Sequence, residues 1–318
     1  MLNRRHLRIK TLQILYAFYQ TEDAEYKKFE KELFGSMSKM YDLYIYFLLV
    51  FEELEGFAVE RIEERKLRRV ASQDDLTPNT KFIDNRIIKL LKENQELRGK
   101  SESRKINWSS AEKNDLIKKM FLAITESEIF ETYMDSEDKS FADDKQFLIE
   151  LFKTEIANFG LLHDFLENET VYWQDDIDLV CSMVIKTIKN AEEHELEDEI
   201  NLLPLFRDEE DEVRFVECLM RNIVDRDAEN NELINKLTKN WDLDRIAKMD
   251  IIILKMAITE LIVFPSIPVK VSLNEYIEIA KFYSSPQSKV FINGVLDKSI
   301  VVLTNEGLIK KTGRGLLT

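Results

Sequence analysis

The amino-terminal segment holds the side chains best suited to chemistry with an anion. Residues 1–20 contain Arg4, Arg5, Arg8 and Lys10 and no acidic residue, so this segment carries a charge of +4. Arg4 and Arg8 are four residues apart and share one face of a helix. Planar guanidinium groups pair bidentately with phosphate and stack on bases. The pattern suggests a local site for an anion, and the alternative is an ordinary solvated terminus.

The charge of the whole chain qualifies this interpretation. A net charge of −15 argues against general nucleic-acid binding. The distribution is uneven, however, because residues 281–318 also carry +4 and residues 21–280 therefore carry −23. Salt confines each field to roughly 10 Å. A basic end can therefore act as a local anion site on an acidic protein.

The sequence shows no catalytic or metal-binding constellation. It has no Gly-rich phosphate loop and no CxxC, HExxH or GxSxG motif. His6, His163 and His194 are isolated, and Cys181 and Cys218 lie far apart among apolar neighbours, as free thiols of a reducing compartment do. No apolar run approaches the roughly 18 residues that a membrane span needs. We therefore expect a cytoplasmic, non-enzymatic protein without cofactor or metal.

The spacing of apolar residues predicts an all-α fold. Gly (8) and Pro (5) are scarce, and apolar side chains recur at helical spacing. Gly294 inside the last helix implies close approach of a neighbouring helix, and the tail after Gly307 is expected to fray. Helices are expected at about 3–20, 36–70, 82–98, 109–133, 145–168, 174–195, 213–226 and 228–239, after Asp242, and from about 272 and 285. Capping patterns predict helix starts at Thr77 before Pro78, at Ser109 with Glu112, and at Ser272 with Glu275.

Four stretches of the sequence carry a family signature. They are Arg4-Arg5-His6-Leu7-Arg8 with Leu12 to Ala17 (LQILYA), Met249 to Leu261 (MDIIILKMAITEL), Val269 to Lys281 (VKVSLNEYIEIAK) and Phe291 to Lys298 (FINGVLDK). In this order and spacing they resemble the NusB family. The resemblance covers about residues 1–34 and 208–303, which is under half of the chain.

The resemblance implies a fold and a function. The fold is a bundle of two antiparallel three-helix units. NusB proteins bind the boxA element of nascent ribosomal RNA leaders together with NusE, a small-subunit ribosomal protein, and the pair joins RNA polymerase and suppresses early termination. Expected RNA contacts are Arg4, Arg5, His6, Arg8, Lys10 and Lys289. Expected NusE contacts are Asp244, Asp250 and Lys255.

The sequence also departs from the family pattern. Ile9 stands where the family commonly has Glu, and Lys10 replaces a small residue. Before the last helix, Gln287 and Val290 stand where an acid and a cation are common. Lys289 can replace that cation one position earlier, which on a helix rotates it by about 100°.

These observations divide the chain into four parts. We expect a NusB-like Arg-rich helix (1–35), an acidic helical insertion of unknown role (36–207), a NusB-like helical domain (208–303) and a flexible tail (304–318). Two alternatives remain open. One is an interaction scaffold whose acidic insertion recruits a protein partner. The other is an accessory domain of an rRNA methyltransferase, which the missing Gly-rich cofactor loop disfavours.

Overall fold

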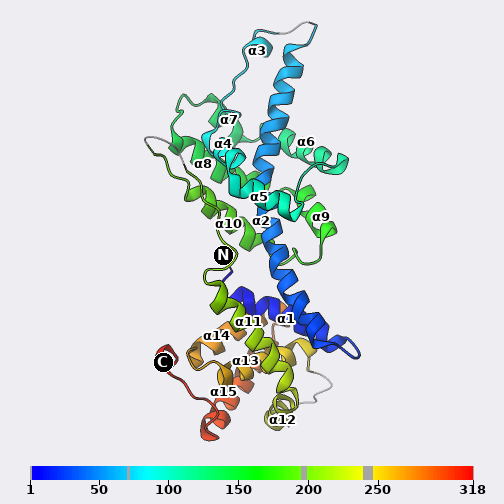
Figure 1. Ribbon diagram of the computed structural model, residues 1–318, viewed down its shortest axis with the longest axis vertical. Coiled ribbons are helices and arrows are strands. Elements are labelled where there is room, and N and C mark those ends of the chain that lie inside the picture. Colours follow the sequence, from blue (N-terminus) through cyan, green and yellow to red (C-terminus); the bar gives the residue numbers. More distant parts are fainter. Residues whose placement is uncertain (1, 70–71, 195–198, 239–245, 318) are drawn as a thin grey trace. The chain divides into compact units, whose positions relative to one another are not determined.

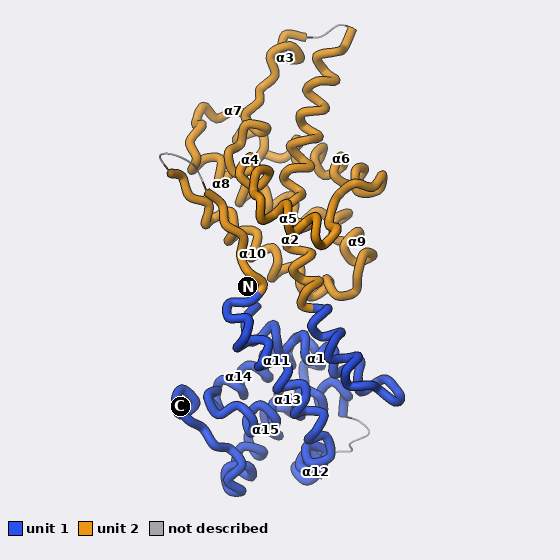
Figure 2. Tube along the Cα trace, viewed as in Figure 1, with its two compact units in different colours: residues 1–36, 206–318 blue, residues 37–205 orange. Residues whose placement is uncertain are grey.

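The computed structural model describes residues 2–69, 72–194, 199–238 and 246–317. Within these ranges the chain forms helices and turns and no β-strand, apart from one isolated bridge between Glu192 and Glu199. The prediction of an all-α fold is therefore confirmed. The chain divides into two compact units (Figures 1 and 2): unit 1 comprises residues 1–36 and 206–318, and unit 2 comprises residues 37–205.

Unit 1 is built around one central helix, α13. This helix packs against α1, α11, α12, α14 and α15. Every side chain from Ile252 to Leu261 is buried, because a helix surrounded by neighbours has no face left for water. The helices of unit 1 are α1 (Arg4–Gln20), the beginning of α2 (Tyr26–Lys66), α11 (Glu209–Asp225), α12 (Asp227–Leu237), α13 (Lys248–Val263), α14 (Val269–Tyr283), α15 (Ser288–Asn305) and the short 3-10 helix η3 (Gly313–Leu316).

Two expectations for the C-terminal helices are wrong. Ser272 does not start a helix, because α14 begins at Val269, directly after Pro268. Ser272 lies inside α14, and its buried hydroxyl donates a hydrogen bond to Glu260 (2.7 Å). At Gly294, a Cβ atom would meet nothing within 4 Å. No neighbouring helix therefore requires a glycine there.

The C-terminal segment of unit 1 is held in place and does not fray as expected. Figure 1 shows it returning from the end of α15 toward α14. The Lys311 ammonium donates to the carbonyl of Phe264 (2.9 Å), and the Thr312 N–H donates to the carbonyl of Pro265 (3.0 Å). A Cβ atom at Gly315 would lie 1.9 Å from the same Pro265 oxygen. Only glycine fits this contact, so Gly315 allows the segment to pack against the turn at Pro265.

Unit 2 has a core rich in aromatic side chains. Phe47 and Phe152 pack edge to face at 5.6 Å, and the buried Trp108 indole donates to the carbonyl of Tyr46 (3.1 Å). The buried Tyr44 hydroxyl contacts the Thr187 hydroxyl and accepts from the Leu203 N–H (3.1 Å). The helices of unit 2 are the remainder of α2, α3 (Gln73–Leu76), α4 (Arg86–Glu93), α5 (Gln95–Arg104), α6 (Ala111–Thr125), α7 (Glu128–Asp135), α8 (Phe141–Leu151), the π-helix η1 (Phe152–Ile156), α9 (Gly160–Glu169) and α10 (Ile177–Lys189).

Polar residues break the helices of unit 2 more often than expected. Thr77 ends α3 rather than starting a helix, and Ser110, not Ser109, caps α6. Asn94 and Ser127 each cap a new helix inside stretches expected to be continuous. The side chains of Ser, Thr and Asn compete for backbone donors, and apolar periodicity alone does not reveal which of them will do so.

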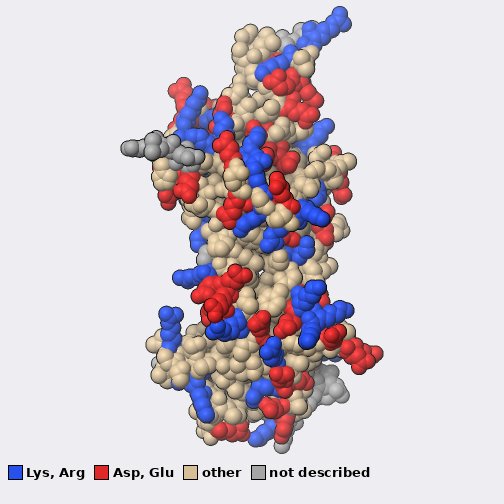
Figure 3. Space-filling model, in the orientation of Figure 1, with Lys and Arg blue, Asp and Glu red and all other residues tan. Residues whose placement is uncertain are grey.

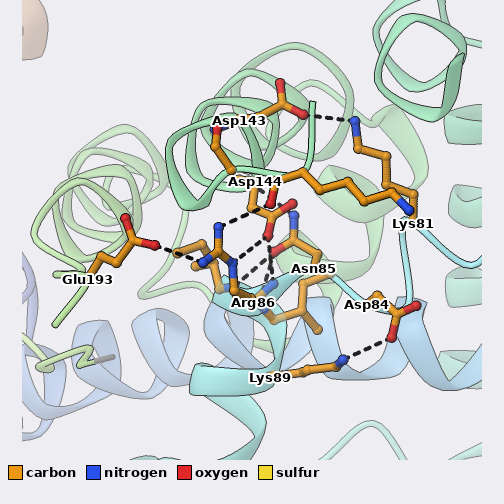
Figure 4. Close-up of polar contacts among 12 residues, drawn as sticks. Lys81, Asp84, Asn85, Arg86, Lys89, Asp143, Asp144 and Glu193 are labelled. Atoms are coloured by element: carbon orange, nitrogen blue, oxygen red, sulfur yellow. Dashed lines mark hydrogen bonds and ion pairs between the residues drawn. The ribbon is translucent and has the colours of Figure 1, made fainter. Parts of the chain in front are cut away.

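A buried polar cluster joins α4 to α8 in unit 2 (Figure 4). Asn85, which caps α4, donates to the carbonyl of Asp144 (3.1 Å), and the Tyr133 hydroxyl donates to the Asp144 carboxylate (2.6 Å). Arg86 bridges Asp144 (3.3 Å) and Glu193 (2.8 Å). Lys81 pairs with Asp143 at 2.8 Å. Each charged group of this cluster lies beside a group of the opposite charge, which gives the cluster a structural role.

Candidate nucleic-acid interface

A reciprocal cap fixes the first turn of α1. The Asn3 side-chain oxygen accepts hydrogen bonds from the N–H groups of Arg5 (2.9 Å) and His6 (3.1 Å). The Asn3 N–H donates to Nδ1 of His6 (3.4 Å). Such a cap satisfies donors that the first turn of a helix leaves free. The cap therefore fixes the backbone that carries the arginine side chains of the first turn.

Burial and neighbouring cations determine the charge of His6. Burial of the ring and the nearby Arg5 and Lys10 cations lower the pKa of His6 to about 4. The ring is therefore neutral near pH 7. It holds the helix start and adds no positive charge to the interface.

Arg8 lies in the core of unit 1. Its guanidinium makes two hydrogen bonds to the Glu260 carboxylate of α13, at 2.7 and 2.8 Å, and both side chains are almost fully buried. Glu260 also accepts from the hydroxyls of Ser272 (2.7 Å) and Tyr276 (2.9 Å) on α14. Burial alone lowers the pKa of Arg8, but the hydrogen bonds to Glu260 outweigh it and raise that pKa. The pair joins α1, α13 and α14.

Arg4 and Arg5 remain accessible above this buried pair. Arg5 binds the Glu275 carboxylate of α14 through two hydrogen bonds of 2.8 Å, and its side chain is 45% exposed. The hydrogen bond from Arg5 holds the pKa of Glu275 below its usual value. Arg4 pairs with the exposed Asp211 of α11 (2.6 Å) and lies over the Phe215 ring, 4.1 Å from its centroid. Both guanidinium groups are held in place and still reach solvent.

These side chains line an open groove of about 1060 Å³ in unit 1. Its polar wall comes from the first turn of α1, with Asp211 and Glu275 opposite. Its apolar wall comes from Pro268 in the turn before α14, from Val271 in the first turn of α14, and from Leu317. Arg314 of η3 completes the lining. Cations beside apolar surface are what a single nucleic-acid strand requires, because phosphates need charge and bases need contact area.

The structure separates the other predicted site residues. Lys10 is buried, and Lys289 is exposed at the start of α15. Asp250 is buried and accepts a hydrogen bond from Ser284. Lys255 is buried, pairs with Asp227 (2.6 Å) and lies over the Tyr19 ring. Asp244 lies outside the described residues.

Several residues of this interface could not be identified from the sequence. Glu260, Tyr276 and Arg314 all belong to the groove or to the layer directly beneath it. One signal was available for Glu260, since a carboxylate within the apolar stretch Ile251 to Leu261 needs a buried cation as its partner. Nothing in the sequence around Arg314 indicated this position, because residue spacing along the chain does not reveal that the C-terminal segment lies beside α1.

Membrane spans and metal sites are both absent from the described ranges. No helix within them has the length and apolar character required to cross a bilayer. Nor do they bring together three or more His, Cys, Asp or Glu side chains in an arrangement that could hold a metal ion.

Comparisons with known proteins agree on one family. The NusB family profile matches residues 176–300, so the match begins in unit 2, before the expected start at 208, and does not include α1. A transcription antitermination protein NusB from Salinibacter ruber is 43% identical over 138 residues, which are 42% of this chain and 86% of that protein.

Two further proteins of the same name match over shorter stretches. The one from Chloroherpeton thalassium is 38% identical over 104 residues, 33% of this chain and 47% of that protein. The one from Natranaerobius thermophilus is 44% identical over 68 residues, 21% of this chain and 49% of that protein. The chain therefore spans about half the length of these two, and no solved structure matches it significantly. Because the first relative is matched over most of its length, the chain belongs to the NusB family.

Proposed function

We propose that this protein is a non-enzymatic transcription antitermination factor that binds boxA-type single-stranded RNA in the groove of unit 1. Its proposed partners are the ribosomal protein NusE and the antitermination complex of RNA polymerase, in the cytoplasm. The relatives named transcription antitermination protein NusB support the general function. The observation that carries the RNA-binding proposal is the groove, which combines accessible arginines with an apolar wall.

The structure divides the predicted RNA contacts into two layers. Arg4, Arg5 and Lys289 are accessible and are proposed to contact RNA directly. Arg8 and Lys10 are buried in the free protein. We assign them to the supporting layer, because a side chain without solvent contact reaches a phosphate only if the core opens.

Binding requires that the accessible arginines exchange or share their present partners. The Arg4–Asp211 pair is largely exposed, and exposed pairs contribute only about 0–1 kcal/mol. Replacing Asp211 with a phosphate therefore costs little. The Arg8–Glu260 pair is buried and stays intact, because separating it would leave two uncompensated charges in the core.

Two of the residues predicted to contact NusE lie beneath the surface. Asp250 and Lys255 are buried, so neither contacts a partner directly in this structure. Lys255 instead positions the half-exposed Asp227, to which the Tyr19 hydroxyl also donates (2.7 Å). We propose that this edge, where α1, α12 and α13 meet, faces NusE.

Binding of a short fluorescein-labelled boxA-type RNA across a salt series tests the proposal. The comparison is between the wild type and Arg4→Ala/Arg5→Ala, with NusE present. Arg8 is kept, because its loss would damage the fold. We expect weaker binding and a salt slope reduced by roughly 0.7 for each phosphate that no longer has a cation beside it.

A matched control separates this site from general electrostatics. Arg221→Ala/Lys236→Ala removes the same charge from exposed positions on α11 and α12. These two side chains do not line the groove, so the control should bind like the wild type. If the two double variants bind RNA equally well, the groove is not the RNA site.

A second candidate function is a protein-interaction scaffold. It is favoured by the charge of unit 2, which holds 22 Lys and Arg against 37 Asp and Glu. Figure 3 shows acidic and basic side chains interspersed over the face drawn, so on that face the excess acid does not form one continuous patch. A wild type that binds a protein partner but shows no preference for boxA-type over scrambled RNA would favour the scaffold.

A further inference from the structure

The groove contains a guanidinium that differs from the three arginines of α1. Arg4, Arg5 and Arg8 each face a carboxylate, respectively that of Asp211, Glu275 and Glu260. Arg314 is exposed and lines the same groove, and its guanidinium makes no hydrogen bond or ion pair with any described residue. An arginine presents five donors and no acceptor. Within the described residues, the donors of Arg314 therefore remain free for a ligand.

The backbone that carries Arg314 is fixed on both sides of it. Before it, Lys311 and Thr312 are bonded to the carbonyls of Phe264 and Pro265. After it, Gly315 is buried against Pro265 so closely that no side chain fits. Ordering a segment costs roughly 1–2 kcal/mol per residue in backbone entropy. These contacts already order the segment in the unbound protein, so a ligand does not have to order it on binding. The backbone of Arg314 and Leu317 is therefore positioned in advance.

We propose that residues 311–317 form the C-terminal wall of the RNA groove. Arg314 contacts an RNA phosphate, and Leu317, together with Pro268 and Val271, contacts the neighbouring base or ribose. This inference rests on the proposed function and extends it to a segment about 290 residues beyond the end of α1 in the sequence.

The test uses the full chain and a fluorescein-labelled boxA-type RNA. Arg314→Ala should weaken binding about fivefold near 0.1 M salt and reduce the salt slope by roughly 0.7, as expected for one phosphate contact. Gly315→Val keeps the Arg314 charge but clashes with Pro265, and it should weaken binding to a similar extent. Lys310→Ala removes the same charge from an exposed position outside the groove lining and should leave binding unchanged.

The outcomes distinguish this inference from the proposed function. If Arg4→Ala/Arg5→Ala abolishes RNA binding while Arg314→Ala binds like Lys310→Ala, the groove is used but its C-terminal wall is not, and the inference is overturned. If Gly315→Val binds like the wild type, positioning of the segment is overturned. If the wild type does not bind the RNA, both proposals fail. Circular dichroism melting of each variant confirms that the compared proteins are folded.

Discussion

Units 1 and 2 differ in how many charges they carry and in where they bury them. Unit 1 holds 23 Lys and Arg and 23 Asp and Glu, so it is balanced, and the whole net charge of −15 falls on unit 2. The largest fully buried side chains of unit 1 nevertheless include the cations Arg8 and Lys10. Those of unit 2 are aromatic, and include Trp108, Tyr44 and Phe152.

The difference shows how a neutral domain can present a basic groove. In unit 1 the carboxylates lie opposite the arginines, one for each side chain of the α1 cluster. This pairing holds long side chains in defined positions and lowers the desolvation cost of Arg8. The aromatic part of the core of unit 2 contains no such pair, because its edge-to-face rings pack with satisfied polar ends. The ion pairs that Lys81 and Arg86 make in unit 2 lie in the cluster between α4 and α8. Three measurements would test this contrast between the two cores.

Glu260→Ala should have the largest effect. The substitution removes the hydrogen-bonded partner of the buried Arg8 guanidinium, which keeps only the more distant Glu275 carboxylate (3.8 Å). It also removes the acceptor of the Ser272 and Tyr276 hydroxyls. Breaking a buried ion pair from one side costs about 3–5 kcal/mol. Urea unfolding should show that loss, and native-state hydrogen exchange should place it in unit 1.

Arg214→Ala serves as the control for this variant. Its side chain is 73% exposed and pairs only with Glu210 one turn away, so the change should stay within about 0.5 kcal/mol. Similar losses for the two variants would mean that unit 1 does not depend on its buried ion pair.

Tyr44→Phe should have a smaller effect, located in unit 2. It keeps the ring but removes the hydroxyl that contacts Thr187 and accepts from the Leu203 N–H. Leaving buried donors unsatisfied costs about 1–3 kcal/mol. The free energy of unfolding measures the loss. Tyr16→Phe, at an exposed position on α1, should be neutral, and an equally neutral Tyr44→Phe would show that the core of unit 2 depends on ring packing alone.

The smallest effect expected is a pH dependence of unit 1. The pKa of His6 is about 4 in the folded protein and about 6.5 in the unfolded chain. Between these values the unfolded chain binds a proton that the folded protein does not, so stability falls as the pH falls from about 6.5 toward 4. Below about pH 4.5 the lowered pKa of Glu275 adds to the loss.

His6→Gln should flatten the first part of that dependence. Urea unfolding at several pH values between about 7 and 4.5 compares the two proteins. Superimposable pH profiles would exclude His6 as the titrating group.

Much of the fold could be predicted from the sequence because the signals are local. Apolar periodicity located α1, α11 and α12 to within a few residues. The sequence did not predict which short polar side chains cap a helix. Thr77 ends α3 instead of starting a helix, and Ser272 lies inside α14 and donates to Glu260. The prediction for Gly294 also failed, because what lies beside a helix is not a property of its own sequence.

The candidate site shows the same division. Three arginines at helical spacing near the start of α1 could be recognised from the sequence, because residue type and periodicity are local properties. The burial of Arg8 on Glu260, and the placement of Arg4 and Arg5 along a groove, became visible in the folded protein alone. The same holds for Arg314, which reaches that groove from the other end of the chain. Burial and charge pairing depend on contacts between α1, α13, α14 and the C-terminal segment, and the packing of α13 at the centre of unit 1 sets those contacts.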